Sequence, residues 1–202
     1  MRGGALRFVN DLWSTIGHTT RCFCSRRIAT MTVILGIDPG SRKTGFGLIR
    51  VDRNKPHYVS SGTIHLPSKE PLSVRLKVLF ESLTEVIDTY QPQVAAIERV
   101  FVAKSADSAL KLGQARGAAM VACVMKDLVV YEYAARQIKQ SVVGTGAASK
   151  QQVQHMVTAL LALSAEPKED AADGLAAALC HCHADGLASA LASSGFRAGR
   201  LR

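Results

Sequence analysis

The feature that most constrains the fold is a short apolar run that ends in an acid and a tight turn. Residues 32–37 read TVILGI, with β-branched residues and no charge, and such a run predicts a buried strand. Asp38 is the first charge after it, followed by the turn-forming Pro39-Gly40-Ser41. The Asp38 carboxylate is therefore expected at the end of a strand, where α/β folds place functional sites, although an aspartate there can also simply cap the turn.

The segments that follow alternate between strand and helix patterns. Apolar spacing and turn signals predict strands over 45–51, 57–66, 94–97 and 128–131, and helices over 71–90, 105–125, 134–143, from Ser149, and 168–183. Three strands, helix, strand, helix, strand and helices indicate an α/β fold with a mixed five-stranded sheet that begins as an antiparallel meander. One side of helix 105–125 should permit close packing, since it carries Leu110, Gly113, Gly117, Met120 and Val124.

Charge composition and apolar periodicity divide the chain into three parts. Residues 1–30 contain five arginines and one acid, and we expect them to be a disordered N-terminal extension. They fit an upstream translation start or a leader, and we favour the upstream start. A globular domain is expected over 31–185. Residues 186–202 show no apolar period and are expected to form a flexible basic tail.

The charge balance suits a polyanionic partner but does not require one. Lys and Arg number 25 against 16 Asp and Glu, which gives a formal net charge of +9 and a pI near 9.6. After subtraction of residues 1–30, the remaining chain keeps 20 basic and 15 acidic side chains. A basic surface beside an acidic pocket would require the fold to separate the two signs.

The cysteines and the lack of a long apolar run predict the setting of the protein. Five cysteines are an odd number, and no sustained apolar secretory signal precedes the globular domain, so we expect a reducing, cytoplasmic location. No stretch reaches the ~18 uninterrupted apolar residues that a membrane helix needs. We therefore expect no membrane partner.

Three further acids complement Asp38. Glu98 ends the run 94–97 as Asp38 ends 32–37, so their carboxylates converge if the two strands are neighbours. Asp170 and Asp173 are three residues apart on one face of a predicted helix, in a first turn that favours ionised carboxylates, and alone they fit ordinary helix charges. Together, four carboxylates on three elements repel one another unless cations neutralise them. Oxygen ligands without Cys or His favour Mg²⁺ or Mn²⁺, which is the need of a two-metal phosphodiester hydrolase.

Four blocks carry a resemblance to a known family. They are ILGIDPGS (34–41), AIERVF (96–101), ADSALKLGQARG (106–117) and DAAD (170–173). In order and spacing they resemble the signature blocks of the RuvC Holliday junction resolvases, over residues 31 to about 183. The family's four metal-binding acids fall on Asp38, Glu98, Asp170 and Asp173. Arg99 departs from the glutamine common at that place in the family, which bears on nearby DNA contacts.

The resemblance implies an RNase H-like fold and a metal-dependent activity. It implies an endodeoxyribonuclease that resolves four-way DNA junctions by paired symmetric nicks in homologous recombination and DNA repair. We expect Mg²⁺, two ions per active site, with Mn²⁺ as a substitute. The resemblance further implies a homodimer, whose two-fold symmetry matches that of the junction, and cooperation with the RuvA and RuvB branch-migration proteins.

Four residues are candidates for DNA binding. Arg136, Lys139 and Lys150 surround the loop 144–146, and the family resemblance places DNA-binding lysines at Lys139 and Lys150. Such contacts hold phosphates without reading sequence, while the alternative is an ordinary solvated face. Phe101 follows Glu98 in a polar segment and matches a family aromatic near the branch point. We favour base stacking by Phe101 over burial in the core.

Three other interpretations deserve comparison. Residues 180–183 (CHCH) suggest zinc, but adjacent helical side chains point about 100° apart and do not enclose one ion. An actin-like ATPase also begins with a strand, an aspartate and a phosphate loop, yet this chain is short for two lobes, and ATP turnover would test it. A non-catalytic junction-binding module would not need four acids, and a cleavage assay with Mg²⁺ separates it from a nuclease.

Overall fold

The computed structural model describes residues 31–99 and 105–193. The predictions for residues 1–30, for Phe101 and for 194–202 lie outside the described residues. The described elements, in chain order, are β1 (Thr32–Asp38), β2 (Lys43–Asp52), β3 (Lys55–His65), α2 (Leu72–Tyr90), β4 (Val94–Arg99), α3 (Ala106–Val124), β5 (Val129–Ala134), α4 (Ala135–Val143), α5 (Lys150–Leu160) and α6 (Glu169–Ser193).

The five strands form one mixed sheet in the order β3-β2-β1-β4-β5. β1, β2 and β3 pair antiparallel, whereas β4 pairs parallel with both β1 and β5. Arg53 and Asn54 join β2 to β3 with positive φ angles of 47° and 64°, as in the tight turns that match strand twist. The predicted meander and the mixed five-stranded sheet are confirmed.

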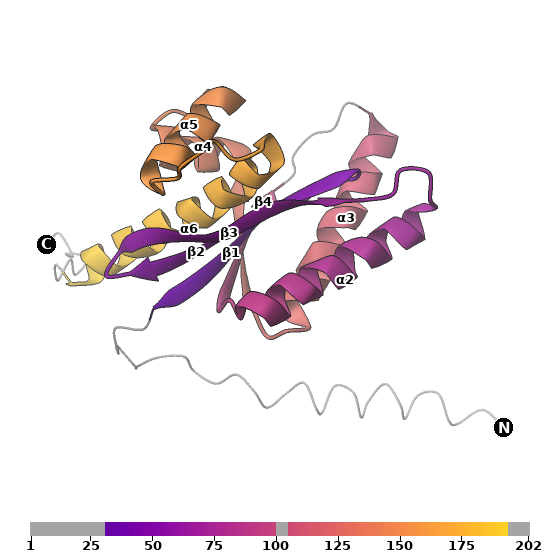
Figure 1. Ribbon diagram of the computed structural model, residues 1–202, viewed down its shortest axis with the longest axis horizontal. Helices are drawn as coiled ribbons and strands as arrows, with labels where there is room; N and C mark the ends of the chain where they lie inside the picture. Colours follow the sequence, from indigo (N-terminus) through magenta and orange to yellow (C-terminus); the bar gives the residue numbers. More distant parts are fainter. Residues whose placement is uncertain (1–30, 100–104, 194–202) are drawn as a thin grey trace, which may run out of the picture. The chain divides into compact units, whose positions relative to one another are not determined.

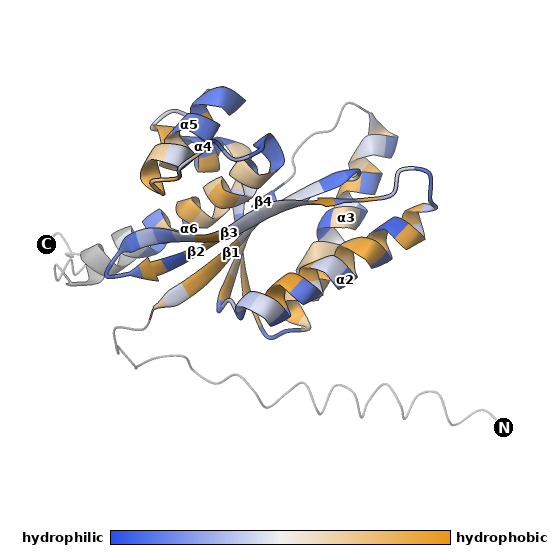
Figure 2. Ribbon diagram, viewed as in Figure 1, coloured by the Kyte–Doolittle hydropathy of each residue, from blue (hydrophilic) through white to orange (hydrophobic). Residues whose placement is uncertain are grey.

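Helices cover both faces of the sheet. Figure 1 shows α4, α5 and α6 on one side of it and α2 with α3 on the other. α2 interleaves apolar and hydrophilic residues along its length (Figure 2), as expected of a helix with one buried face. Its buried side consists of Arg75, Leu79, Leu83 and Ile87.

On the α6 face of the sheet, the backbone of the helix packs directly against the backbone of the strands. A Cβ atom added to Gly36 would lie 2.0 Å from the carbonyl oxygen of Gly174, and one added to Gly45 would lie 1.8 Å from that of Asp170. At Gly47 the nearest atom, the Leu175 nitrogen, would be 2.5 Å away. Glycine is therefore required at these strand positions, and the first turns of α6 rest directly on β1 and β2.

Three sequence predictions need correction. α6 continues to Ser193 instead of ending near residue 183, so residues 186–193 of the predicted tail are helical, because Ala and Leu dominate this segment and favour helix. β5 extends to Ala134, since its pairing with β4 continues to Arg99. Most of the predicted packing side of α3 faces outward, because the buried residues of that helix are Ala115, Ala119, Ala122 and Cys123. Of the predicted side, Met120 is partly buried against the core.

The described residues also allow a statement on membrane-spanning helices and on the cysteines. Within the described ranges, no helix is both long and apolar enough to cross a membrane. Cys123, Cys180 and Cys182 are buried as free thiols.

Candidate active site

Asp38 and Glu98 lie side by side because of strand register and side-chain alternation. β1 and β4 are parallel neighbours, with Ile37 paired to Ile97. Both isoleucines belong to the core that packs under α2 and α3. Since successive strand residues point to opposite faces, Asp38 and Glu98 point to the other face, the one that α6 covers.

α6 adds the two helix acids, but to different degrees. Asp173 lines the same cavity as Asp38 and Glu98. Asp170 does not line it, and its Oδ2 lies 3.7 Å from the Nζ of Lys43 at the start of β2. The structure thus brings three of the four predicted acids into one cavity and places the fourth at its edge, in an ion pair.

The cavity is small and combines acids, lysines and apolar walls. Its volume is about 210 Å³. Lys139 of α4 and Lys150 of α5 line it together with the three acids. The rest of the lining consists of Ala135, Ile138 and Val153. Two of the predicted DNA-binding residues therefore lie beside the predicted metal-binding acids, so a phosphate held by the lysines would reach the carboxylates.

The surroundings of the cavity acids disfavour their ionised forms. Burial, followed by repulsion from Glu98 and Asp173, raises the pKa of Asp38 to about 8. Burial and the charge of Asp173 raise the pKa of Glu98 to about 7. The pKa of Asp173 is also raised, chiefly by burial, although Lys150 opposes the shift. A site in this condition gains from any added cation.

Lys150 is shared between two acids of α6. Its Nζ donates a hydrogen bond to Oε1 of Glu169 and lies 3.7 Å from Oδ2 of Asp173. The bond to Glu169 is the main cause of a raised Lys150 pKa. The backbone under Lys150 is fixed by a capping box of Ser149 and Gln152, which confirms the predicted start of this helix.

The cavity offers the oxygen ligands that suit a hard divalent cation, but its acids are widely spaced. Within the described residues, no three His, Cys, Asp or Glu side chains lie close enough together to enclose one ion. Lysines stand against the two helix acids. The oxygen-only ligands of Asp38, Glu98 and Asp173 nevertheless fit Mg²⁺ or Mn²⁺.

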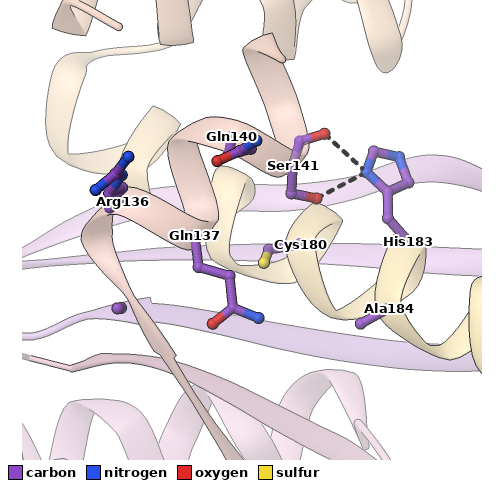
Figure 3. A pocket seen from close by; sticks show the side chains of 8 residues that line it. Arg136, Gln137, Gln140, Ser141, Cys180, His183 and Ala184 are labelled. Atoms are coloured by element: carbon purple, nitrogen blue, oxygen red, sulfur yellow. Dashed lines mark hydrogen bonds between the residues drawn. The ribbon is translucent and has the colours of Figure 1, made fainter. Parts of the chain in front are cut away.

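Arg136 lies apart from the two cavity lysines. It lines a second hollow of about 570 Å³ between α4 and α6, which Figure 3 shows from close by. In this hollow His183 Nδ1 lies 3.0 Å from the Ser141 hydroxyl and 3.2 Å from the Ser141 carbonyl oxygen. Cys180 also lines it (Figure 3). The structure therefore separates Arg136 from the acids.

The residues 180–183 make separate contacts. The Nδ1 of His181 is 2.7 Å from the Tyr133 hydroxyl, and its ring stacks at 4.4 Å on Tyr131. His183 turns instead to Ser141 on α4. The two histidines thus point to different neighbours, as the helical geometry of the segment predicts.

Arg99 takes part in a charge cluster on the opposite face of the sheet. Its Nε lies 3.6 Å from Oε2 of Glu132, and Arg116 of α3 donates a hydrogen bond to the same oxygen. The cluster joins the end of β4 to α3. Arg99 is half exposed and does not line the cavity.

Two charged neighbours of the acids were missed from the sequence. Lys43 forms an ion pair with Asp170, and Glu169 forms one with Lys150. Lys43 follows the Asp38 turn so closely that a hairpin pairing could have located it. Glu169 looked like an ordinary acid of a first helical turn, and no sequence signal joins it to Lys150.

The comparisons with known sequences agree on one family. A family model described as "Crossover junction endodeoxyribonuclease RuvC" matches residues 34–181. A relative of that name from Saccharophagus degradans is 59% identical over 172 residues, which cover 85% of this chain and 99% of the relative. Another from Aliivibrio salmonicida is 56% identical over 174 residues, 85% of this chain and 100% of the relative.

Solved structures resemble the described fold as well. The structure named "T. thermophilus RuvC in complex with Holliday junction substrate" has a TM-score of 0.73 and 31% identity, and the match covers 79% of this chain and 98% of that one. The yeast mitochondrial Holliday junction resolvase has a TM-score of 0.61, with 83% and 86% of the chains covered. At 10% identity, it supports the fold alone. These likenesses confirm the predicted RNase H-like α/β fold.

Proposed function

The chain belongs to the RuvC family of crossover junction endodeoxyribonucleases, and from this we propose that it resolves four-way (Holliday) DNA junctions. The reaction is the hydrolysis of phosphodiester bonds by paired symmetric nicks, in recombination and repair. The observation that carries the proposal is the meeting of Asp38, Glu98 and Asp173 with Lys139 and Lys150 in one cavity. We further propose that this happens in the cytoplasm.

The carboxylates are proposed to hold Mg²⁺, two ions per site, with Mn²⁺ as a substitute. Asp38, Glu98 and Asp173 would be the main ligands, and Asp170 would complete the set from the cavity edge. When bound, such ions activate the attacking water and stabilise the leaving oxygen. The pKa values of Asp38 and Glu98, raised by burial and then by neighbouring carboxylates, support this proposal, because a bound cation stabilises the ionised form of both groups.

The lysines are proposed to orient the DNA. Lys139 and Lys150 would hold phosphates at the cavity, and Arg136 at the start of α4 would contact the DNA backbone outside it. Such contacts position the duplex without reading its sequence. Stacking of Phe101 on a base near the branch point stays part of the proposal, although this residue lies outside the described ones.

A second copy of the chain is the proposed partner on α3. The outward side of this helix exposes Leu110 by 68% and Met125 by 69%, with Val121 and Val124 between them. A Cβ atom on Gly113 or Gly117 would meet nothing within 4 Å. Exposed apolar stripes of this kind mark protein interfaces, and the small glycines permit close helix contact. Cooperation with RuvA and RuvB stays a proposal from family membership.

Cleavage of a synthetic mobile junction by the purified full chain tests the proposal. With Mg²⁺ we expect paired nicks at symmetric positions on opposing strands, and no cut in a linear duplex of the same sequence. Chelation of the metal should stop cleavage and leave junction binding. Equal cutting of duplex and junction, or no cutting of either, would exclude junction resolution.

A further inference from the structure

Lys150 lies between an acid of the cavity and an acid outside it. Its hydrogen bond is to Glu169, whereas its Nζ stays 3.7 Å from Asp173, beyond ordinary hydrogen-bond length. Asp173 lines the cavity with Asp38 and Glu98, and Glu169 does not. The direct partner of the lysine is thus the outer acid.

The charges of the cavity pull the lysine inward. Asp38, Glu98 and Asp173 all interact electrostatically with Lys150, and a lysine ammonium on its four-carbon stem is free to follow such a pull. An ammonium that settles on Asp173 occupies the oxygens that a divalent cation needs. Some opposing contact must therefore keep the ammonium away from them.

Glu169 is well placed to provide that contact. It stands one turn before Asp173 on the same face of α6, since the two residues are four apart. Lys150 is the first residue of α5, behind the Ser149 capping box. Both partners are therefore carried by helix starts with fixed backbones, so their contact sets the position of the ammonium relative to the cavity.

We propose that Glu169 is a positioning residue that holds the Lys150 ammonium at the cavity mouth and so keeps Asp173 available to a divalent cation. One hydrogen of the ammonium is used by Glu169, and the other two remain for a DNA phosphate. The inference rests on the proposed function, because it requires cations to bind at Asp173.

Mg²⁺ binding to the full chain without DNA tests this role by calorimetry. Glu169→Gln should weaken Mg²⁺ binding roughly two- to fivefold, the range expected for loss of an exposed ion pair. The matched control is Glu166→Gln, which removes one exposed negative charge just before α6. It should leave Mg²⁺ affinity unchanged, and an equal loss there would reduce the Glu169 effect to a general charge effect and overturn the proposal.

The decisive comparison repeats Glu169→Gln in a Lys150→Met background. Without the lysine, the substitution should no longer alter Mg²⁺ affinity, because no ammonium remains to be held. An undiminished effect would show that Glu169 acts on the cation directly and would overturn the positioning role. In junction cleavage, Glu169→Gln should raise the Mg²⁺ concentration for half-maximal rate, and an unchanged concentration would overturn the positioning role.

Mg²⁺ binding and junction cleavage by the unaltered chain separate a failure of the proposed function from a failure of the Glu169 role alone. If the unaltered chain binds no Mg²⁺ and cuts no junction, the proposed function and the role of Glu169 fall together. If it binds Mg²⁺ and cuts junctions while Glu169→Gln matches it in Mg²⁺ affinity, only the positioning role is overturned.

Discussion

The two faces of the sheet are packed in different ways. On the α2 and α3 face, large side chains such as Leu35, Ile37 and Leu83 fill the space between sheet and helices. On the α6 face, glycines of the strands meet the helix backbone itself, and a Cβ atom on Gly174 would lie 2.6 Å from the carbonyl carbon of Phe46.

The difference shows how the fold places its acids. A layer of side chains can adjust when one member changes size, whereas two backbones in contact cannot. The first turns of α6 are therefore fixed against β1 and β2, and this fixes Asp173 relative to Asp38 at the end of β1. We infer that the α2 and α3 face mainly supplies stability and that the α6 face supplies stability and site geometry together.

Leu83→Ala gives the largest expected change in stability. Leu83 is fully buried between α2 and the sheet, so its truncation should cost about 2–5 kcal/mol of unfolding free energy. Below the melting temperature, cleavage per folded molecule should stay normal. Urea unfolding and a junction cleavage assay measure the two quantities, and a loss of activity in the folded protein would show that the α2 and α3 face also sets the site geometry.

Gly174→Ala should lower the unfolding free energy less than Leu83→Ala does, and should lower the cleavage activity more. The added methyl group meets the backbone of β2, and such overpacking costs about 1–3 kcal/mol. Because α6 must shift to relieve the contact, Asp173 moves with it and cleavage should fall at least about tenfold. Normal cleavage by the folded variant would show that the backbone contact does not position the acids.

Stability without divalent cations should fall as the pH rises from 6.5 to 8.5. Asp38 and Glu98 have folded-state pKa values raised to about 8 and about 7, so the folded state keeps protons that the unfolded state releases. Ionisation then destabilises the fold by on the order of 1 kcal/mol, the value of one pKa unit. The measurement is thermal unfolding at both pH values.

Two controls sharpen this result. Asp38→Asn should show a shallower fall, because it removes the group with the higher pKa. Mg²⁺ should stabilise the protein more at pH 8.5 than at pH 6.5, since it binds ionised carboxylates. A stability that rises over this range in the unaltered protein would contradict the electrostatic description of the cavity.

Gly186→Ala is the smallest expected effect and has the opposite sign. Gly186 lies in the same helix as Gly174, but a Cβ atom there would meet nothing within 4 Å. The substitution should raise the unfolding free energy by about 0.5–1 kcal/mol, because alanine favours helix over glycine. If chemical denaturation shows a loss instead, glycine contact is not what distinguishes the two positions.

Local patterns were sufficient to predict the strands and the acids at their ends. The apolar runs before Asp38 and Glu98 predicted the strands, and the parallel pairing of Ile37 with Ile97 made the two carboxylates neighbours. The helix acids were harder. Their spacing of three predicted a common face, yet Asp173 lines the cavity and Asp170 pairs with Lys43. The way α6 docks on the sheet decides which of the two acids enters the cavity.

Other features depend on contacts that the sequence pattern does not contain. Residues 186–193 continue α6, although the sequence has no apolar period there that would predict a helix. The side with Gly113 and Gly117 looked like a packing surface, and the structure turns it outward. The pairing of Glu169 with Lys150 joins residues 19 positions apart, and nothing local predicts it.

Asp38→Asn, assayed for junction binding and junction cleavage in one preparation, tests most directly whether this cavity carries out the chemistry. We expect binding in the absence of Mg²⁺ to stay near that of the unaltered protein, because the lysines hold the phosphates. Cleavage with Mg²⁺ should fall by on the order of 10³-fold or more. Cleavage at a normal rate would contradict the assignment of the chemistry to this cavity, and so would loss of binding in a variant that folds normally.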